Sequence, residues 1–592
     1  MDKLKKPKYI ESPSRNFCVL NASVMNDPKD GKDKLMFTSF VDGGTGIFAI
    51  IDPKTDTGES YLFPCDNGAW AVCRVDERRV AIGTCATKGA IHTFDLIDRK
   101  FIKTTYVPGN TYVWNLVMAS DGNLYGGTYY GNVIVKYSPE TMEAEVVTRC
   151  DEYTGNYYSR TVYADVNGSG NILVSSGMDV PNVCVYNIYE KKVTANIPGN
   201  ITTINDVYFG VKDAKGGFFD KKDADGTAYF DRKTCKQISA DQLPAPVNSE
   251  KDRSLLSDGT KAFIYKQGYK YIDENGQSYV RKNPVIPPPT GIMNIACDEK
   301  DNVWGASGFG QTIFSLDPDT GSFKNTNQVT DNGGEVYGIV PIKDRVYLTA
   351  YIGCMHIVYY PDKPWSQEDN TNPNTFRLFS SEGYARPEGR SIIGPDGNIY
   401  TGLMANYGVY GGAVTKLCID TNETAIWENK INDYAIGGIF ADRKYVYAIT
   451  CGQGNGMPTR DVPTYVFRLD CDLNLVESID CGKKYFAGAA MLDGVVCVAC
   501  YDGEENKQYL WYSSDNFKTI KKIPVDFRIS GLIVVPKKNM FVFSTENRMG
   551  KLDCDGNFEF IYEFERYVNR ICSAPSGRVF ASCEEQVFEC EF

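Results

Sequence analysis

One short unit recurs along almost the whole sequence, and this repeat limits the fold more than any other feature. Each copy has a turn rich in Asp, Gly and Asn, then a short apolar strand, a second strand and a turn of the type Asp-Pro-x-Thr, as in SDGNLYGGT, PDGNIYTGL and PSGRVFASC. A period near 40–50 residues with four short strands per copy is typical of a β-propeller blade. If one central residue marks the first strand of each copy, successive markers lie 39 to 53 residues apart: Phe37, Ala81, Tyr125, Leu173, Phe219, Phe263, Trp304, Tyr347, Tyr400, Tyr447, Cys497, Phe541 and Phe580.

Thirteen copies exceed the roughly four to eight blades of a single propeller, so the sequence predicts an all-β fold of two tandem six- or seven-bladed rings. The run NPVIPPPT at 283–290 is the expected linker, because consecutive prolines cannot donate to a β-ladder. We predict a first propeller in residues 1–286, with about six blades and an N-terminal closing strand, and a second in 287–592, with about seven blades. The last copy ends after three strands, so closure of that blade by residues 8–12 is an open alternative.

The composition predicts a soluble, cytoplasmic protein. No apolar run approaches the ~18 residues of a membrane span, and the N-terminus lacks the apolar stretch of a secretion signal. A net charge of −12 without a Lys/Arg block argues against nucleic-acid or membrane partners. The nineteen cysteines are an odd number scattered through strand-like runs, so we expect reduced thiols.

The repeats resemble those of a known group of propellers. Turns such as IDPKT at 51–55 and LDPDTG at 316–321, which follow DGN-Ile/Leu-Tyr strands, are similar to the repeats of streptogramin-lyase-like and SMP-30-like propellers. They also look like those of bacterial propeller polysaccharide lyases. The resemblance implies a propeller throughout and favours lyase chemistry. Such lyases commonly use histidines with tyrosine, arginine or a metal, whereas this chain has only two histidines.

Familiar catalytic and metal motifs are absent from the sequence. It contains no GxSxG, Walker, HExxH or strand–GxGxxG–helix pattern. Cys497 and Cys500 form a CxxC within an apolar strand, where positions three apart face opposite sides, so a zinc site is not expected. We predict no cofactor and no metal site, although a single divalent cation is left open.

The strongest candidate site combines arginines, tyrosines and a histidine of two adjacent blades in the second predicted ring. Loops that open on one face of a propeller reach its central channel, where ligands bind. We predict catalytic roles for His356, Tyr351 and Arg390, because histidine titrates near neutral pH and arginine can clamp a carboxylate. The predicted substrate-binding residues are Arg386, Glu388, Tyr407, Tyr129, Tyr158 and Arg160. The alternative for His356 and His92 is a satisfied strand histidine, and for the arginines a structural ion-pair network.

Two functions are compatible with these residues. The first is a lyase that cleaves a uronic-acid-containing oligo- or polysaccharide by β-elimination, which needs a cation for the carboxylate, a base for the α-proton and an acid for the leaving oxygen. Its partner would be an acidic oligosaccharide or another small-molecule substrate. The second is a non-catalytic propeller that binds a protein or glycan through the same face, using aromatic and arginine anchors. The sequence leaves the substrate and the oligomeric state open.

Overall fold

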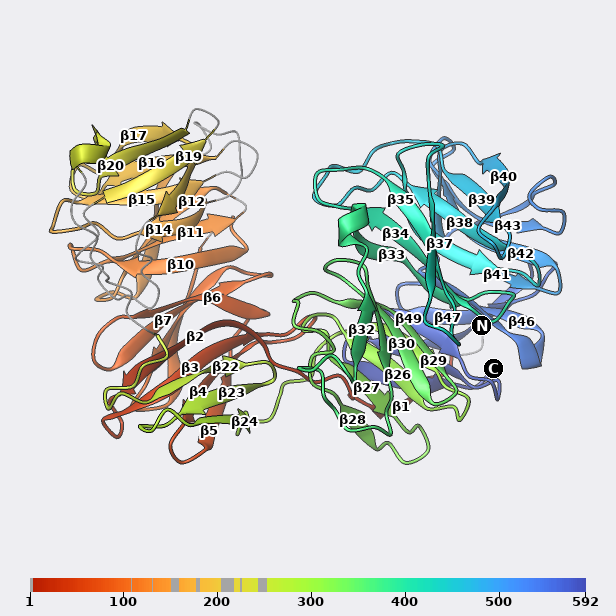
Figure 1. Cartoon of the computed structure of the whole chain (residues 1–592), viewed down its shortest axis with the longest axis horizontal. Helices are drawn as coiled ribbons and strands as arrows, with labels where there is room; N and C mark the ends of the chain where they lie inside the picture. The colour runs from red at the N-terminus through yellow and green to blue at the C-terminus, as the bar shows by residue number, and fades with distance from the viewer. Residues whose placement is uncertain are drawn as a thin grey trace. The chain divides into compact units, whose positions relative to one another are not determined.

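A computed structural model describes residues 4–107, 109–129, 131–150, 159–176, 181–203, 218–223, 226–242 and 253–592 of the chain. These residues form antiparallel strands and three short 3₁₀ turns, η1 (Ala240–Gln242), η2 (Ser380–Glu382) and η3 (Pro536–Lys538). Contacts divide the chain into two compact units, Phe17–Pro288 and a second unit made of Met1–Asn16 with Pro289–Phe592. We call them the six-bladed unit and the seven-bladed unit, after the sheets formed by their described residues (Figure 1).

The six-bladed unit contains the first six repeats. Its sheets are, in chain order, β2 (Cys18–Asp27), β3 (Lys32–Phe40), β4 (Ile47–Asp52) and β5 (Thr57–Leu62); β6 (Gly68–Arg74), β7 (Arg79–Cys85), β8 (Ala90–Asp95) and β9 (Lys100–Tyr106); β10 (Tyr112–Met118), β11 (Leu124–Tyr129), β12 (Val133–Ser138) and β13 (Glu143–Arg149); β14 (Ser159–Tyr163), β15 (Asn171–Ser176), β16 (Asn182–Asn187) and β17 (Lys192–Pro198); β18 (Asn200–Thr203), β19 (Phe218–Asp223), β20 (Gly226–Asp231) and β21 (Gln237–Ile238); and β22 (Lys261–Tyr265), β23 (Gly268–Ile272) and β24 (Ser278–Lys282). A single pair, Tyr112 with Cys85, links the second and third sheets. The strand β22 of the last sheet lies beside β2 of the first.

The seven-bladed unit contains the remaining repeats. Its sheets are β25 (Ile292–Cys297), β26 (Val303–Ser307), β27 (Ile313–Leu316) and β28 (Phe323–Asn325); β29 (Val336–Ile342), β30 (Arg345–Ala350), β31 (Met355–Tyr359) and β32 (Asn374–Arg377); β33 (Tyr384–Ile393), β34 (Ile399–Ala405), β35 (Gly412–Leu417) and β36 (Thr424–Glu428); β37 (Ala435–Ala441), β38 (Val446–Cys451), β39 (Tyr465–Leu469) and β40 (Leu475–Asp480); β41 (Lys484–Leu492), β42 (Val495–Asp502), β43 (Lys507–Ser513) and β44 (Lys521–Val525); β45 (Gly531–Val535), β46 (Met540–Ser544), β47 (Arg548–Leu552) and β48 (Phe558–Glu563); and β49 (Arg570–Ser573), β50 (Val579–Cys583) and β51 (Gln586–Cys590) with β1 (Lys8–Glu11). The inner strands β25, β29, β33, β37, β41, β45 and β49 contact one another in order, and β49 returns to β25. The ring is therefore closed.

The N-terminal strand closes the seven-bladed ring, which differs from its expected place in the first propeller. The strand β1 pairs antiparallel with β51, with Lys8 opposite Glu589 and Tyr9 opposite Phe588. The final repeat supplies only three strands, so without β1 the strand β51 would expose an unpaired edge. In Figure 1 the red N-terminal strand accordingly lies within the unit that holds the blue C-terminal strands.

In these repeats, an aspartate in the turn before the marker strand fixes where that strand begins. The carboxylate of Asp396 accepts hydrogen bonds from the backbone N–H of Asn398 (3.2 Å) and the phenol of Tyr400 (3.2 Å). The same arrangement joins Asp298 to the indole of Trp304 at 3.0 Å. One aspartate thus closes the turn and satisfies the polar end of the buried marker aromatic four to six residues later. All thirteen marker residues lie in strands, one in each blade of the described chain, with Ala81 and Tyr125 in the two blades that share an eight-stranded sheet.

The sheets are held together by apolar clusters between neighbouring blades. One cluster joins Ile292 and Phe314 of the first sheet in the seven-bladed ring to Phe580 and Val587 of the last, which seals the ring where it closes. The nineteen cysteines are free thiols, most of them in strands. No helix in the described ranges is both long enough and apolar enough to span a membrane.

Candidate functional site

Most inner strands carry a one-residue bulge near their start, and this bulge places a side chain at the channel. Of two neighbouring residues on such a strand, one has no partner on the adjacent strand, which bends the backbone and turns the extra side chain. The extra residue is Trp70 in β6, Trp114 in β10, Arg160 in β14 and Tyr337 in β29. The bulged position therefore carries a different type of side chain, aromatic or cationic, in different blades.

The strand β33 departs from this pattern. Between Arg386 and Arg390 its register advances four residues, whereas the partner strand advances only two, from Met404 to Gly402. Arg390 adopts a left-handed conformation with φ of 62°, an uncommon and costly state for a residue with a side chain. Gly389 is required beside it, because a Cβ there would lie 2.8 Å from the Cα of Gly402. The enlarged bulge brings Arg386, Glu388 and Arg390 together at one end of the channel.

The guanidinium groups of Arg386, Arg390 and Arg570 all lie within electrostatic range of the Glu388 carboxylate, and Arg390 lies within range of Arg570. Arg390 donates to the backbone carbonyl of Tyr337 at 3.3 Å, and Arg570 of β49 donates to that of Met293 at 3.0 Å. Burial and repulsion by Arg570 lower the pKa of Arg390 to about 9. Burial also lowers the pKa of Arg570, while Glu388 opposes both shifts. Two cations held close together without full compensation favour an anion between them.

Arg386 lies at the aromatic side of the same cluster. Its Nη1 donates to the phenol of Tyr337 at 3.0 Å, and its guanidinium stacks 4.4 Å from the ring centroid of Tyr351. The phenols of Tyr351 and Tyr407 hydrogen-bond to each other. Burial and the bond to Tyr407 raise the pKa of Tyr351 to about 12. Tyr351 is therefore protonated at neutral pH and can donate a proton but cannot serve as a resting base.

The structure places His356 away from this cluster, which removes it from the candidate site. The imidazole is 1% exposed and lies between the blades, with Nε2 3.3 Å from Thr415 Oγ1 and its ring 5.3 Å from that of Phe379. Burial and the nearby Arg377 lower its pKa to about 3. His356 is thus a neutral packing residue, because its strand position points it into the blade and not at the channel. His92 is likewise fully buried.

The predicted residues of the first ring form a separate group in the six-bladed unit. Tyr129 at the end of β11 packs edge-on against Tyr112 at 5.2 Å, and Arg160 lies 5.5 Å from the ring centroid of Trp114. Tyr158 lies outside the described residues. Tyr129 and Arg160 therefore belong to a different channel from Arg386, Glu388 and Arg390.

Sequence reasoning missed the role of Arg570 in the cluster. Arg570 is 180 residues from Arg390 and reaches it only because β49 closes the ring against β25. The available signal was positional: Arg570 begins the last marker unit, and starts of inner strands converge in a propeller.

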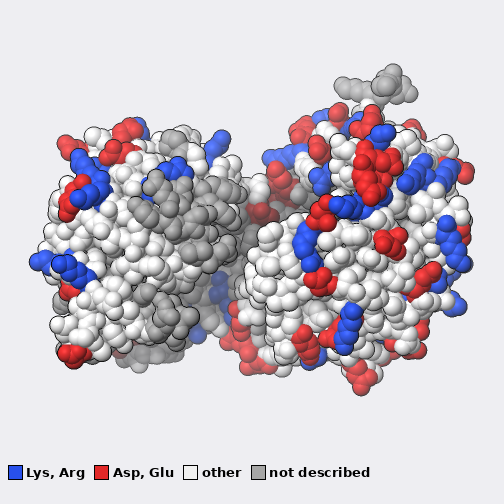
Figure 2. Space-filling view, turned by 90° about the horizontal axis from the view of Figure 1, so that it is seen from above, with Lys and Arg blue, Asp and Glu red and all other residues white. Residues whose placement is uncertain are grey.

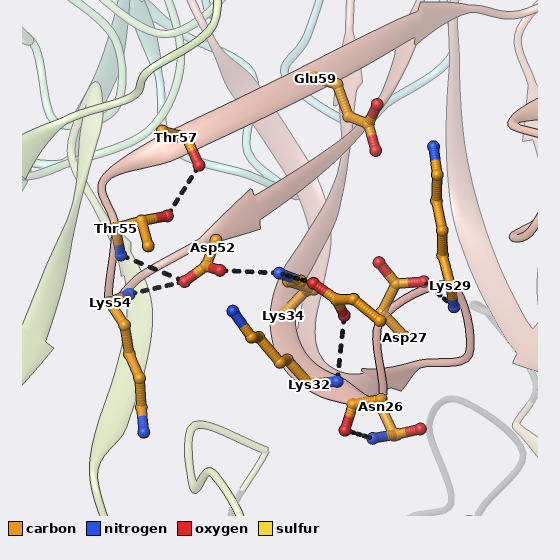
Figure 3. A network of polar contacts seen from close by, with 12 residues as sticks. Asn26, Asp27, Lys29, Lys32, Lys34, Asp52, Lys54, Thr55, Thr57 and Glu59 are labelled. Atoms are coloured by element: carbon orange, nitrogen blue, oxygen red, sulfur yellow. Dashed lines mark hydrogen bonds and ion pairs between the residues drawn. The ribbon is translucent and has the colours of Figure 1, made fainter.

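The arginine cluster differs from the ordinary ion pairs of the protein. In the first blade Lys34 bonds to Asp52 at 2.7 Å and Asp30 at 2.8 Å, while Asp52 also caps the turn at Lys54 and Thr55 (Figure 3). Each charge there has a partner. On the face shown in Figure 2, both signs are interspersed over the seven-bladed unit.

By contrast, the arginine cluster has no direct carboxylate contact: among described residues, none lies within ion-pair distance of Arg386, Arg390 or Arg570. The same part of the chain contains no group of three or more His, Cys, Asp or Glu side chains arranged to hold a metal ion.

Comparisons with known proteins found structural alignments at low sequence identity. No protein-family model and no curated protein matches the chain. The extracellular domain assigned to a hybrid two-component system of B. thetaiotaomicron aligns over 95% of this chain and 86% of its own, at 12% identity and a TM-score of 0.33. Virginiamycin B lyase from Staphylococcus aureus aligns over 50% of this chain and 94% of its own, at 12% identity and a TM-score of 0.38. The WD40 domain of Neurospora crassa Pan2 covers 50% and 88%, at 8% identity and a TM-score of 0.36.

Proposed function

We propose that the channel mouth of the seven-bladed unit binds the carboxylate of an acidic oligosaccharide, of the kind that contains uronic acids. The observation that carries the proposal is that Arg386, Arg390 and Arg570 lie within electrostatic range of Glu388 but donate hydrogen bonds only to neutral groups. A ligand carboxylate would neutralise the excess positive charge and accept the forked N–H groups of arginine. Tyr407 is 56% exposed and supplies aromatic surface beside it, while the buried Tyr337 and Tyr351 place their hydroxyl groups next to Arg386 and Tyr407.

The test is binding of digalacturonate and trigalacturonate, measured by calorimetry. Arg390→Ala removes one charge-assisted contact, worth roughly 1.5–3 kcal/mol, and should weaken binding about 10- to 150-fold. Arg390→Lys keeps the charge but lacks the two parallel N–H donors of arginine, so its affinity should lie between those of Arg390→Ala and wild type. Arg345→Ala is the matched control, because Arg345 belongs to the same ring but pairs with Asp344 at 2.8 Å.

Neutral sugars complete the binding experiment. Oligosaccharides in which the uronate is reduced to a neutral hexose should bind weakly to wild type and equally to Arg390→Ala. Equal affinity of wild type and Arg390→Ala for trigalacturonate would overturn the proposed site.

The same cluster supports β-elimination as a second candidate function. The arginines would neutralise the sugar carboxylate, Glu388 would accept the α-proton, and the protonated Tyr351 would donate its proton to the leaving oxygen as the C–O bond breaks and the ring double bond forms. The specific observation is that the phenol of Tyr351 stays protonated beside Arg386, with its pKa raised to about 12. A phenol in that state can act as the acid of the reaction.

Catalysis is tested by following the ultraviolet absorbance of an unsaturated uronate. Glu388→Gln should lower cleavage about 10²–10⁴-fold while trigalacturonate still binds. Tyr351→Phe should likewise lower the cleavage rate while trigalacturonate still binds. If wild type binds trigalacturonate but produces no unsaturated product, the protein is a binding module and the lyase candidate fails without affecting the binding site.

A further inference from the structure

The inner surface of the six-bladed unit carries an aromatic wall, which we define as Trp70, Tyr112, Trp114 and Tyr129 with the cation Arg160. Trp70 and Trp114 are the bulged residues of the successive inner strands β6 and β10, and their rings are 5.7 Å apart. Tyr112 stacks on Trp114 at 4.9 Å with an angle of 25° between the rings. Arg160, the bulged residue of β14, lies 5.5 Å from the ring centroid of Trp114.

The wall is built and held by the backbone around it. Asn21 donates to the carbonyl of Trp70 at 2.6 Å, and Asn115 donates to the carbonyl of Val162 at 2.8 Å. These bonds tie each bulged strand to its neighbour in the ring. The position of the two indoles is therefore set by the ring and does not depend on a loop.

Exposure separates these indoles from a packed core. Trp70, Tyr112 and Trp114 are only partly buried, and Arg160 is exposed. In the seven-bladed unit, Trp511 is 3% exposed and Trp304 is 8% exposed, as expected for core residues. Trp365 and Trp427 are partly buried as well, but they pack against apolar clusters, and the clusters of the described residues include neither Trp70 nor Trp114. Adjacent large aromatic residues that remain accessible at the centre of a ring are typical of a binding surface.

We propose that the aromatic wall is a second saccharide-binding site, which stacks a pyranose ring on Trp70 and Trp114. One face of a pyranose presents C–H groups that pack on an aromatic ring, while its rim presents hydroxyls. Indole and phenol groups combine an apolar face with a polar edge and suit such a ligand, and Arg160 is placed to bind a hydroxyl or carboxylate at the rim. This site uses none of the residues proposed to bind a carboxylate in the seven-bladed unit, so it stands whether or not that proposal holds.

Tryptophan fluorescence gives a direct readout, because Trp70 and Trp114 are the only tryptophans of residues 17–288. Phenylalanine replaces Trp304, Trp365, Trp427 and Trp511 in the full chain, so that all emission comes from the aromatic wall. The probes are maltotriose, cellotriose, xylotriose and trigalacturonate. At least one should shift or quench the emission with saturation, and calorimetry on the unmodified chain should give the same affinity.

Variants connect the signal to the site. In the otherwise natural chain, Trp114→Ala and Trp70→Ala should each weaken binding of the responding saccharide by 10-fold or more, and Trp114→Phe should retain part of the affinity. Trp427→Phe is the matched control and should change nothing. Melting curves show whether each variant folds, and Trp114→Phe keeps the test valid if the alanine variant does not.

Three results would overturn the proposal. The first is the absence of a saturable response to all four saccharides. The second is binding that Trp70→Ala, Trp114→Ala and Trp114→Phe leave unchanged in folded protein. The third is a response to adenosine or guanosine monophosphate without any response to saccharides, which would assign the wall to nucleobases.

Discussion

The two units use one backbone device to build two different channels. In both, a bulge near the start of an inner strand supplies a side chain to the ring interior. In the six-bladed unit this position holds Trp70, Trp114 and Arg160, whereas in the seven-bladed unit it holds Tyr337 next to the enlarged bulge of β33. The difference shows that ring architecture and channel chemistry are separable, because a bulged residue packs against few neighbours and can change without disturbing a blade.

The units also differ in how their described strands reach closure. The seven-bladed ring depends on β1, which comes from the far end of the chain, whereas the first sheet of the six-bladed unit is built from the consecutive strands β2 to β5. Loss of one strand should therefore affect a blade that is completed by a distant strand differently from a blade that is built from consecutive strands.

The largest expected effect comes from removing residues 1–12. This deletion takes away β1, including Tyr9, whose ring lies 5.8 Å from that of Phe588, and Ile10, which packs in the closing cluster. Tyr9 is 48% exposed and Ile10 is partly buried, so their burial contributes about 1.5–3 kcal/mol. In addition, β51 would lose its ladder hydrogen bonds to β1 and be left as an open edge. Hydrogen exchange resolved by peptide should show faster exchange across residues 289–592 and unchanged exchange across 17–288. Equal protection of both units would show that β1 does not hold the ring closed.

Buried lysines allow the two units to be damaged in matched ways. Lys34 pairs with Asp52 at 2.7 Å in one unit, and Lys484 pairs with Asp502 at 2.8 Å in the other. Replacing either lysine with Met leaves a buried carboxylate uncompensated and should cost its own unit about 3–5 kcal/mol of unfolding free energy. Calorimetric melting of both variants checks this.

The double variant Lys34→Met/Asp52→Asn serves as the control, because it removes both charges while the amide oxygen can still accept the turn hydrogen bonds of Lys54 and Thr55, which should restore most of the lost stability. If Lys34→Met and Lys484→Met lower the same melting transition, the units unfold together. Their stabilities are then not separate quantities and cannot be compared.

The two channels should act independently in binding. Arg390→Ala should weaken trigalacturonate binding to the seven-bladed unit about 10- to 150-fold and leave saccharide quenching of the aromatic wall unchanged. Trp114→Ala should do the reverse. In the double variant the two effects should add within about 0.5 kcal/mol, because the variants share no partner. A larger coupling energy, measured by titration of all four proteins, would contradict independent sites.

Acid should weaken both units through their buried histidines. Burial lowers the pKa of His356 to about 3 and also lowers that of His92. A folded-state pKa below the unfolded value of about 6.5 means that the stabilising contribution is complete above pH 6.5 and is lost as pH falls toward the folded pKa. The loss is at most about 1.4 kcal/mol per pH unit for each histidine. Urea unfolding at pH 7.5, 6 and 5 measures it.

Leucine variants separate the two histidines. His356→Leu and His92→Leu should each reduce the loss of unfolding free energy between pH 7.5 and pH 5, because each variant removes one buried histidine. At pH 7.5, His92→Leu should lower the free energy of unfolding by about 1–3 kcal/mol more than His356→Leu does, since His92 bonds to both Thr104 Oγ1 (3.0 Å) and the carbonyl of Cys65 (3.3 Å). An unchanged pH dependence in His356→Leu would mean that His356 is not buried in its neutral form.

Local sequence patterns predicted the blades well. Every marker residue, from Phe37 to Phe580, lies in a strand, because turn chemistry and strand alternation act over a few residues and are visible in the sequence. By contacts, the chain divides between Pro288 and Pro289, within the proline run, but residues 1–16 group with the later repeats and not with the first. Candidate residues Tyr351, Arg386 and Tyr407 also come together, because starts of inner strands and neighbouring loops share one end of a ring.

Other features were decided only by the tertiary structure. Tyr351 and His356 are five residues apart, yet one joins the arginine cluster and the other is enclosed between blades, since the side to which a strand residue points depends on pairing and packing. Arg570 meets Arg390 and β1 meets β51 only when the first and last blades close the ring. The sequence by itself therefore determined the repeating blade, which depends on local chemistry. Ring closure decided which distant side chains share a channel, because it joins segments hundreds of residues apart that no local pattern relates.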